Sequence, residues 1–411
     1  MEAAPAGPRV PLDAYQKRLV VFLSVATFFE GYDFFALAQL LPELRREFGL
    51  EPAAAGWMIA VINVGTVVAG VVVRLADTWG RRRVLALTIA GYTLASLATA
   101  MTGSVVGFAL AQLVARAFLI GEWAVAMIIL AEEYPADRRA TVIGIVQASA
   151  SLGGIVCAAV VPLLLQTSLG WRAVYVVGAV PLVIVAIIRR GMRETRRFTE
   201  QQAGPDARTL LAIIRGPYRR RVALLGLIWA LTYVCCQSAL TFWKEFAVAE
   251  RSFTNGQIGM TISIAALAAM PLLFGTGRLL DVLGRRMGGA VVFSVAAAGV
   301  VASYTLHSQA ALTVALVAAV FGTSSVLPVL NAYTTELFPT ALRSGGFALA
   351  NNVLGRAGFV LAPIMVGEAA GHWGYGLAVA VTAVPMMLAL ALILTFLPET
   401  RGQELEATSA C

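Results

Sequence analysis

The sequence predicts an all-α membrane protein with twelve transmembrane helices in two pseudo-symmetric six-helix bundles, and three observations support that prediction. Of the 411 residues, 59% are hydrophobic and only 13% are charged, whereas a soluble protein carries about 25% charged residues. Apolar runs of about 20 residues, the length of helix that crosses the hydrocarbon core of a bilayer, recur along the whole chain. Several short motifs also occur twice, at one constant offset.

The apolar runs are separated by short polar turns and define twelve expected spans. These spans are residues 19–41, 57–76, 84–101, 105–130, 140–165, 171–189, 221–243, 258–280, 287–306, 310–334, 345–367 and 374–397. The polar start of the chain could pass for the n-region of a signal peptide, but the run after it is too long and contains carboxylates. We therefore expect an uncleaved first helix.

The basic residues predict how the chain crosses the membrane. An even number of spans places both termini on one side. The termini and the even-numbered connections hold 24 of the 31 Lys and Arg residues, and the odd-numbered connections hold 5. Because Lys and Arg are retained on the cytoplasmic side, we expect a multi-pass protein of the inner (cytoplasmic) membrane with both termini cytoplasmic. The net charge of +8 reflects this topology, so no nucleic-acid partner is expected.

The longest connection divides the spans into two sets of six. The expected organisation is a cytoplasmic N-terminal tail (1–18), an N-terminal six-helix bundle (19–189), a cytoplasmic linker (190–220), a C-terminal six-helix bundle (221–397) and a cytoplasmic C-terminal tail (398–411). A repeat supports the division, because residues 77–82 (DTWGRR) match residues 281–286 (DVLGRR) at an offset of 204. The same offset relates Glu132 to Glu336 and Arg139 to Arg343.

Four ionisable side chains lie near the middle of the expected spans, namely Glu30, Asp33, Arg116 and Arg356. A charge at the centre of a membrane helix costs about 2.5–3.5 kcal/mol on insertion scales, and such residues mark ion and substrate pathways by default. Acids and arginines at one depth can neutralise one another, and an alternative is that they pair only to fix helix packing. Glu122 points away from Arg116 on the same helix and is expected to brace packing or line the inner pathway.

The paired motifs resemble those of the major facilitator superfamily over nearly the whole chain. They are the two DxxGRR loops, AEEYPADRRAT (131–141), TELFPTALRSG (335–345) and PETRGQE (398–404). The segments EGYDFF (30–35) and 116–141 are similar to the metabolite:proton symporter and sugar-porter-like branches, which include carriers of carboxylic acids. The first DxxGRR loop lacks the glycine that the pattern expects at position 73 or 74, whereas the second copy has Gly277.

The resemblance implies a transporter whose two halves alternate access to a central cavity, with charge networks at the cytoplasmic ends that open and close. The expected members of this cytoplasmic gate network are Asp77, Arg81, Glu132, Arg139, Asp281, Arg285, Glu336, Arg343 and Glu399. A simpler alternative is that each DxxGRR loop is only a tight turn with positive-inside anchoring.

In the cavity we expect proton coupling by Asp33, with Glu30 as the reserve candidate. The expected substrate-binding residues are Arg356, Arg116, Tyr32, Gln147, Gln237, Asn331, Tyr333 and Asn352. For any single Asn or Gln, a hydrogen bond between helices is an equally good explanation.

The first functional hypothesis is a secondary active transporter, a proton-coupled symporter that imports a small organic anion, because the arginine fork donates two parallel hydrogen bonds to a carboxylate. One alternative is a proton-driven exporter of organic cations or drugs, in which Glu30 and Asp33 bind the cation. Another is a proton-coupled sugar or polyol symporter.

An enzyme is not expected, because the sequence lacks a nucleophile, base or metal constellation. The two histidines, His307 and His372, fall in odd-numbered connections, and the four cysteines have no metal-binding spacing. We expect no cofactor and no metal. The expected partners are a small-molecule substrate, protons and the lipid bilayer, with the monomer as the functional unit.

Overall fold

The computed structural model describes residues 13–134, 136–179, 213, 215–339 and 342–401, and the elements formed by these residues are all helices. The first half contains α1 (Ala14–Phe48), α2 (Pro52–Trp79), α3 (Arg81–Ala100), α4 (Val105–Glu133) and α5 (Ala136–Leu164). The second half contains α9 (Arg219–Thr241), α10 (Trp243–Arg251), α11 (Asn255–Thr305), α12 (Gln309–Glu336), α13 (Arg343–Phe347), the π-helix η2 (Ala348–Gly355), α14 (Arg356–Ala380) and α15 (Ala383–Phe396).

The two longest helical stretches each contain two of the expected spans. In the 51-residue α11, Gly284 has φ 84° and joins the span that ends at the DxxGRR loop to the next one. The other stretch, Gly345–Phe396, runs from α13 to α15, and within it Gly374 of α14, with φ 77°, has the same role. Within the described residues, nine helical stretches are long and apolar enough to cross a membrane. Two of these nine stretches, Asn255–Thr305 and Gly345–Phe396, each cover two expected spans. Most of the expected span 171–189 lies outside the described residues.

Several helices are longer than the apolar runs that predict them. Helix α1 begins five residues before its run, because the Asp13 side chain caps the free N–H groups of the first turn in a reciprocal arrangement with Gln16. It ends at Gly49, whose φ of 63° suits a glycine C-cap. Capping of this kind extends a membrane helix into the polar interface.

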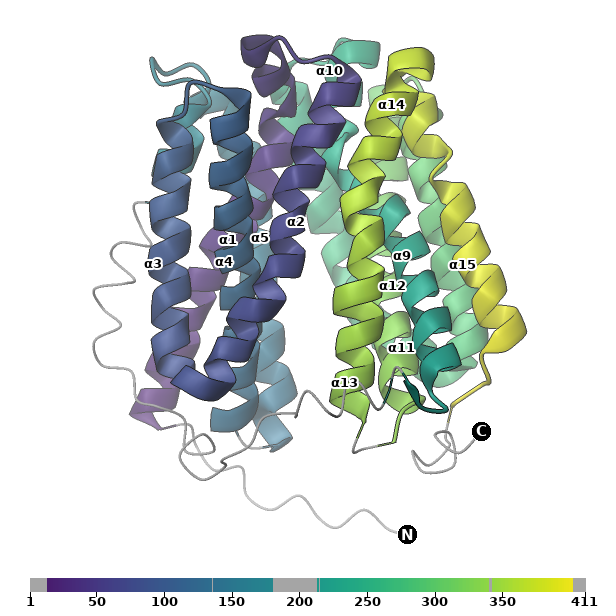
Figure 1. Ribbon diagram of the computed structural model, residues 1–411. Coiled ribbons are helices and arrows are strands. Elements are labelled where there is room, and N and C mark those ends of the chain that lie inside the picture. Colours follow the sequence, from purple (N-terminus) through teal and green to yellow (C-terminus); the bar gives the residue numbers. More distant parts are fainter. Residues whose placement is uncertain (1–12, 135, 180–212, 214, 340–341, 402–411) are drawn as a thin grey trace.

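Figure 1 shows two groups of helices side by side, α1–α5 in one and α9–α15 in the other. We call the end at which α1 begins and α15 finishes the lower end, and the end that carries α10 the upper end. Helices of one group cross closely where glycine removes the side chain. A Cβ on Gly153 of α5 would lie 1.8 Å from the Phe28 carbonyl oxygen of α1, and one on Gly31 would lie 2.0 Å from that of Ala150.

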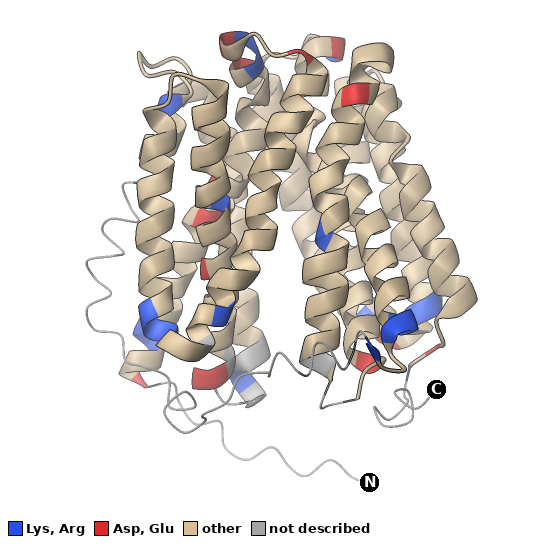
Figure 2. Cartoon of the chain, in the orientation of Figure 1, with Lys and Arg blue, Asp and Glu red and all other residues tan. Residues whose placement is uncertain are grey.

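The two groups are in contact at the upper end, where α2 packs on α14. A Cβ on Gly56 would lie 2.2 Å from the Pro363 carbonyl oxygen, and one on Gly367 would lie 2.6 Å from that of Pro52. The ribbons of the two groups diverge toward the lower end (Figure 1). Figure 2 shows most charged residues at the two ends and a few at intermediate depth, inside the helical groups.

Candidate functional site

Asp33 of α1 and Arg116 of α4 form the charged centre of the first half. Both are buried, with exposed fractions of 3% and 5%, and they attract each other electrostatically. The Arg116 guanidinium lies 4.5 Å from the centroid of the Phe34 ring, so an aromatic face covers part of the cation. Tyr92 of α3 adjoins the same carboxylate. This arrangement offers Asp33 a counter-ion in a region that excludes water.

Glu30 lies one turn before Asp33 on α1 but has a different neighbour. It is 3% exposed, and the charged group that acts on it is the carboxyl of Glu122 on α4, which is fully buried. The group of four charges expected from the sequence is therefore divided, with Asp33 beside an arginine and Glu30 beside another acid. Two neighbouring carboxylates repel when both are ionised, and a proton on one of them would remove this repulsion.

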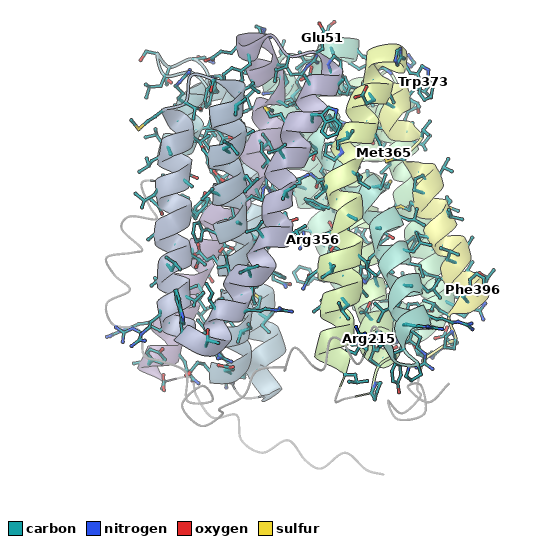
Figure 3. All side chains as sticks on the ribbon, viewed as in Figure 1. Glu51, Arg215, Arg356, Met365, Trp373 and Phe396 are labelled. Carbon is teal, nitrogen blue, oxygen red and sulfur yellow. The ribbon has the colours of Figure 1, made fainter. Side chains whose placement is uncertain are left out.

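Arg356 is the charged centre of the second half, and Figure 3 shows it at mid-height on α14, facing the first half. Its guanidinium carbon lies 5.5 Å from the ring centroid of Tyr233 and 5.3 Å from that of Phe359. The Tyr233 hydroxyl donates to Asn351 Oδ1 at 2.9 Å. Arg356 directly follows the π-helix η2, a geometry that is frequent at functional sites.

The two arginines belong to different halves, but their charges act on each other. Arg356 acts electrostatically on Arg116, as Asp33 does. Asn63 of α2 also connects the halves near this level by donating to the Phe359 carbonyl at 3.1 Å. The centre of the molecule therefore combines two guanidinium groups, one from each half, with the carboxylate of Asp33.

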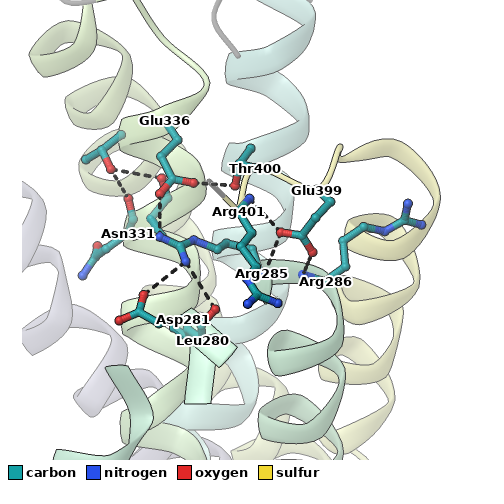
Figure 4. Close-up of polar contacts among 11 residues, drawn as sticks. Leu280, Asp281, Arg285, Arg286, Asn331, Glu336, Glu399, Thr400 and Arg401 are labelled. Carbon is teal, nitrogen blue, oxygen red and sulfur yellow. Dashed lines mark hydrogen bonds and ion pairs between the residues drawn. The ribbon is translucent and has the colours of Figure 1, made fainter. Parts of the chain in front are cut away.

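The other residues expected to bind substrate lie in several different places. The Tyr32 hydroxyl donates to the Val174 carbonyl at 3.3 Å, a contact between helices. Tyr333 is buried at the lower end, where Glu399 and Arg286 act on it, and Asn331 lies beside the same lower cluster (Figure 4), so neither joins the central arginines. Gln147 and Asn352 are exposed and Gln237 is half-buried; none of the three forms a described side-chain contact with the arginines.

The lower ends of both halves carry similar ion pairs. Arg81 pairs with Glu132 at 3.2 Å, and at the common offset Arg285 pairs with Glu336 at 3.1 Å. Arg285 also pairs with Asp281 at 3.4 Å. These pairs lie within one half each.

Glu399 completes the cluster of the second half (Figure 4) by accepting hydrogen bonds from the backbone N–H groups of Arg285 and Arg286 at 2.8 and 2.9 Å. The side chains of Asp77, Arg139 and Arg343 lie outside the described residues.

An upper charge cluster was not predicted from the sequence, and it joins the two halves. Lys244 of α10 is 2% exposed; it donates to the Gln39 carbonyl and pairs with Glu43 of α1 at 3.3 Å. Arg45 of α1 pairs with Glu245 of α10. The available signal was the presence of opposite charges in two outer connections, at 43–47 and at 244–245, but nothing in the sequence indicates that these connections meet.

Comparison with known proteins identifies the family. The Major Facilitator Superfamily profile matches residues 23–355 and 244–410. A probable 4-methylmuconolactone transporter of Cupriavidus pinatubonensis is 28% identical over 92% of this chain and 89% of its own length. A putative niacin/nicotinamide transporter of Bacillus subtilis is 25% identical over 95% and 98%.

Among solved structures, the inward open xylose transporter of E. coli superimposes with a TM-score of 0.78 at 16% identity, covering 96% of this chain and 99% of that one. Neighbours of this fold have twelve transmembrane helices in two bundles, as the sequence predicts here. The chain is therefore a multi-pass membrane transporter, not an enzyme, and it belongs to the major facilitator superfamily.

Proposed function

We propose that this transporter is a proton-coupled symporter that imports a small organic anion, a carboxylate, by alternating access across the inner (cytoplasmic) membrane. The observation that carries the proposal is that Arg116 and Arg356, one from each half, act on each other electrostatically, while Asp33 is the carboxylate that acts on Arg116. An anionic substrate would neutralise the remaining positive charge.

A carboxylate suits this region for two reasons. An arginine fork can hold a carboxylate through two parallel hydrogen bonds, and Arg356 Nε has no hydrogen-bond partner among the described residues. The rings of Tyr233 and Phe359 flank Arg356, and Phe34 flanks Arg116, so a planar or unsaturated acid would find apolar walls beside its anion site. The relatives named for niacin and 4-methylmuconolactone support an organic acid.

Proton coupling is assigned to the acids of α1. A neutral carboxylic acid costs much less to bury than a carboxylate, unless a counter-ion is present. Asp33 has that counter-ion in Arg116, and Glu30 has the acid Glu122 instead. In the proposed cycle, binding of the substrate carboxylate draws Arg116 away from Asp33, which then takes up a proton, and the Glu30–Glu122 pair provides a neighbouring proton store.

In this proposal, alternating access is controlled by the upper charge cluster and by the ion pairs at the lower end. The upper ion pairs join the halves in the present structure, which would close the outer side, while the lower pairs Arg81–Glu132 and Arg285–Glu336 lie within each half. The two six-helix bundles (19–189 and 221–397), joined by the linker 190–220, would move against each other. This movement would close the side that is open and open the side that is closed. In this proposal both termini are cytoplasmic and the monomer is the working unit.

Uptake into proteoliposomes tests the function. Vesicles containing the purified protein are given labelled nicotinate or cis,cis-muconate, with the outside more acidic than the inside. We expect accumulation above the external concentration, and collapse of that accumulation when an ionophore dissipates the pH gradient. A labelled organic cation and protein-free vesicles are the controls. Uptake of the cation but of neither acid would overturn the proposal in favour of a cation transporter.

A further inference from the structure

A groove lies at the lower end of the second half, between the start of α9 and the end of α15. It encloses about 420 Å³ and is lined by Arg221 and Arg286 together with apolar side chains such as Leu224, Phe396 and Leu397. Phe396 is 65% exposed and is labelled at the foot of α15 in Figure 3. Because the apolar spans of α9 and α15 end here, the groove lies where hydrocarbon gives way to headgroups.

Both arginines line the groove, and Arg286 presents donors to it. Arg221 donates to the Leu337 carbonyl at 3.1 Å, and Arg286 Nη2 donates to the Leu394 carbonyl. Arg286 Nε and Nη1 have no partner among the described residues. The nearby acid, Glu399, accepts from backbone N–H groups, and Figure 4 shows the Arg286 side chain extending away from it.

The surroundings of the groove add positive charge. Arg219 and Arg220 are exposed at the start of α9, and Arg215 is exposed just before it. None of the three forms an ion pair within the described part of the chain. Arg285, in contrast, is neutralised by Glu336 and Asp281. The groove therefore combines an excess of arginine with an apolar wall, at the depth of the membrane interface.

We propose that this groove binds an anionic phospholipid, with the headgroup phosphate between Arg221 and Arg286 and the acyl chains along Leu224 and Phe396. Clustered basic residues at the end of a membrane helix attract anionic headgroups, and arginine forks match a phosphate. The exposed apolar wall favours a lipid over a free anion, because a free anion has no apolar part to cover it. The site is independent of the transported substrate.

Native mass spectrometry of the delipidated full chain tests the site, with dioleoylphosphatidylglycerol or dioleoylphosphatidylcholine added in detergent. We expect the parent protein to retain phosphatidylglycerol preferentially. The double variant Arg221→Gln/Arg286→Gln should bind it about thirtyfold more weakly, from the loss of two charge contacts at an anionic surface. The matched control Arg251→Gln/Arg278→Gln, which removes two arginines outside the groove, should keep the parent's preference.

Two further measurements keep the test decisive. If the double Gln variant does not fold, Arg221→Lys/Arg286→Lys replaces it and should retain the lipid. In the parent, rising KCl should release phosphatidylglycerol, because exposed charges are screened. Equal retention of both lipids by the parent, equal loss in the control variant, or displacement of the lipid by inorganic phosphate at the same concentration would overturn the proposal.

Discussion

At the scale of single residues, the proposed site depends on the shape of the guanidinium as well as on its charge. Arg356 is half-buried between two aromatic rings. Arg356→Lys keeps the charge but loses the fork, so affinity for an organic anion should fall about thirtyfold, or about 2 kcal/mol. Equilibrium binding of labelled nicotinate measures this, with exposed Arg278→Lys as the control. Unchanged affinity in Arg356→Lys would remove this arginine from the anion site.

The buried acids provide a second prediction at this scale. Asp33→Asn should abolish accumulation driven by a pH gradient while exchange of substrate between equal pools continues, because binding survives and coupling does not. Glu30→Gln and Glu122→Gln should each weaken accumulation less, because the remaining acid can still hold a proton. Uptake and exchange in proteoliposomes separate these outcomes, with Glu368→Gln at the upper end as control. Full pH-driven accumulation by Asp33→Asn would exclude Asp33 as the coupling residue.

At the scale of elements, the break in α11 at Gly284 leaves backbone N–H groups free, and Glu399 caps them from the segment after α15. Burial by itself would raise the pKa of Glu399, but hydrogen bonds from the backbone of Arg286, Arg285 and Arg401 hold it below its ordinary value. A lowered pKa in the folded state means that the carboxylate stabilises the fold above its unfolded pKa. This contribution is lost as pH falls through the folded pKa.

Glu399→Gln should therefore lower stability by about 1 kcal/mol at neutral pH, as loss of a helix cap does. The difference between parent and variant should shrink as the pH falls below about 4. Thermal unfolding in detergent at a series of pH values measures both effects. Asp281→Asn is the control, because the Asp281 side chain is 76% exposed. A difference that does not change with pH would show that the charge of Glu399 is not the stabilising feature.

At the scale of the whole molecule, the upper charge cluster holds the two halves together. Lys244 and Glu245 are both buried against α1. Lys244→Met leaves Glu43 without this ion pair, and removing one partner of a buried pair costs about 3 kcal/mol. The closed upper state should therefore lose population about a hundredfold relative to the open one.

Spin labels at Thr167 and His307, both exposed at the upper end, would report this change as a longer distance between the halves. Arg172→Gln is the control within one half. It breaks a more exposed pair with Glu47 at 2.9 Å, and both partners lie in the first half. An unchanged distance distribution in Lys244→Met, or an equal shift in Arg172→Gln, would contradict a role for Lys244 in closing the upper end.

The fold class and the family could be predicted from the sequence because they depend on features that can be read along the chain, namely the length of apolar runs and the spacing of motifs. The length of each apolar run sets whether a helix can span a bilayer, and the offset of 204 between motifs identifies two similar halves. The comparisons confirm both predictions. The pairing of Arg81 with Glu132 and of Arg285 with Glu336 agrees with the gate network that the resemblance to the superfamily implies, and the repeat makes the two pairs equivalent.

The partners of the central charges were decided only by the tertiary structure. The spacing of Glu30 and Asp33 places both on one face of α1, but it does not say how α4 is rotated and shifted against that face. The packing places Glu122 against Glu30 and Arg116 against Asp33, moves Tyr333 to the lower cluster and brings Lys244 to Glu43. Sequence determines which faces of a helix are polar, whereas contacts between helices depend on rotations and axial shifts that result from the packing of all of them together.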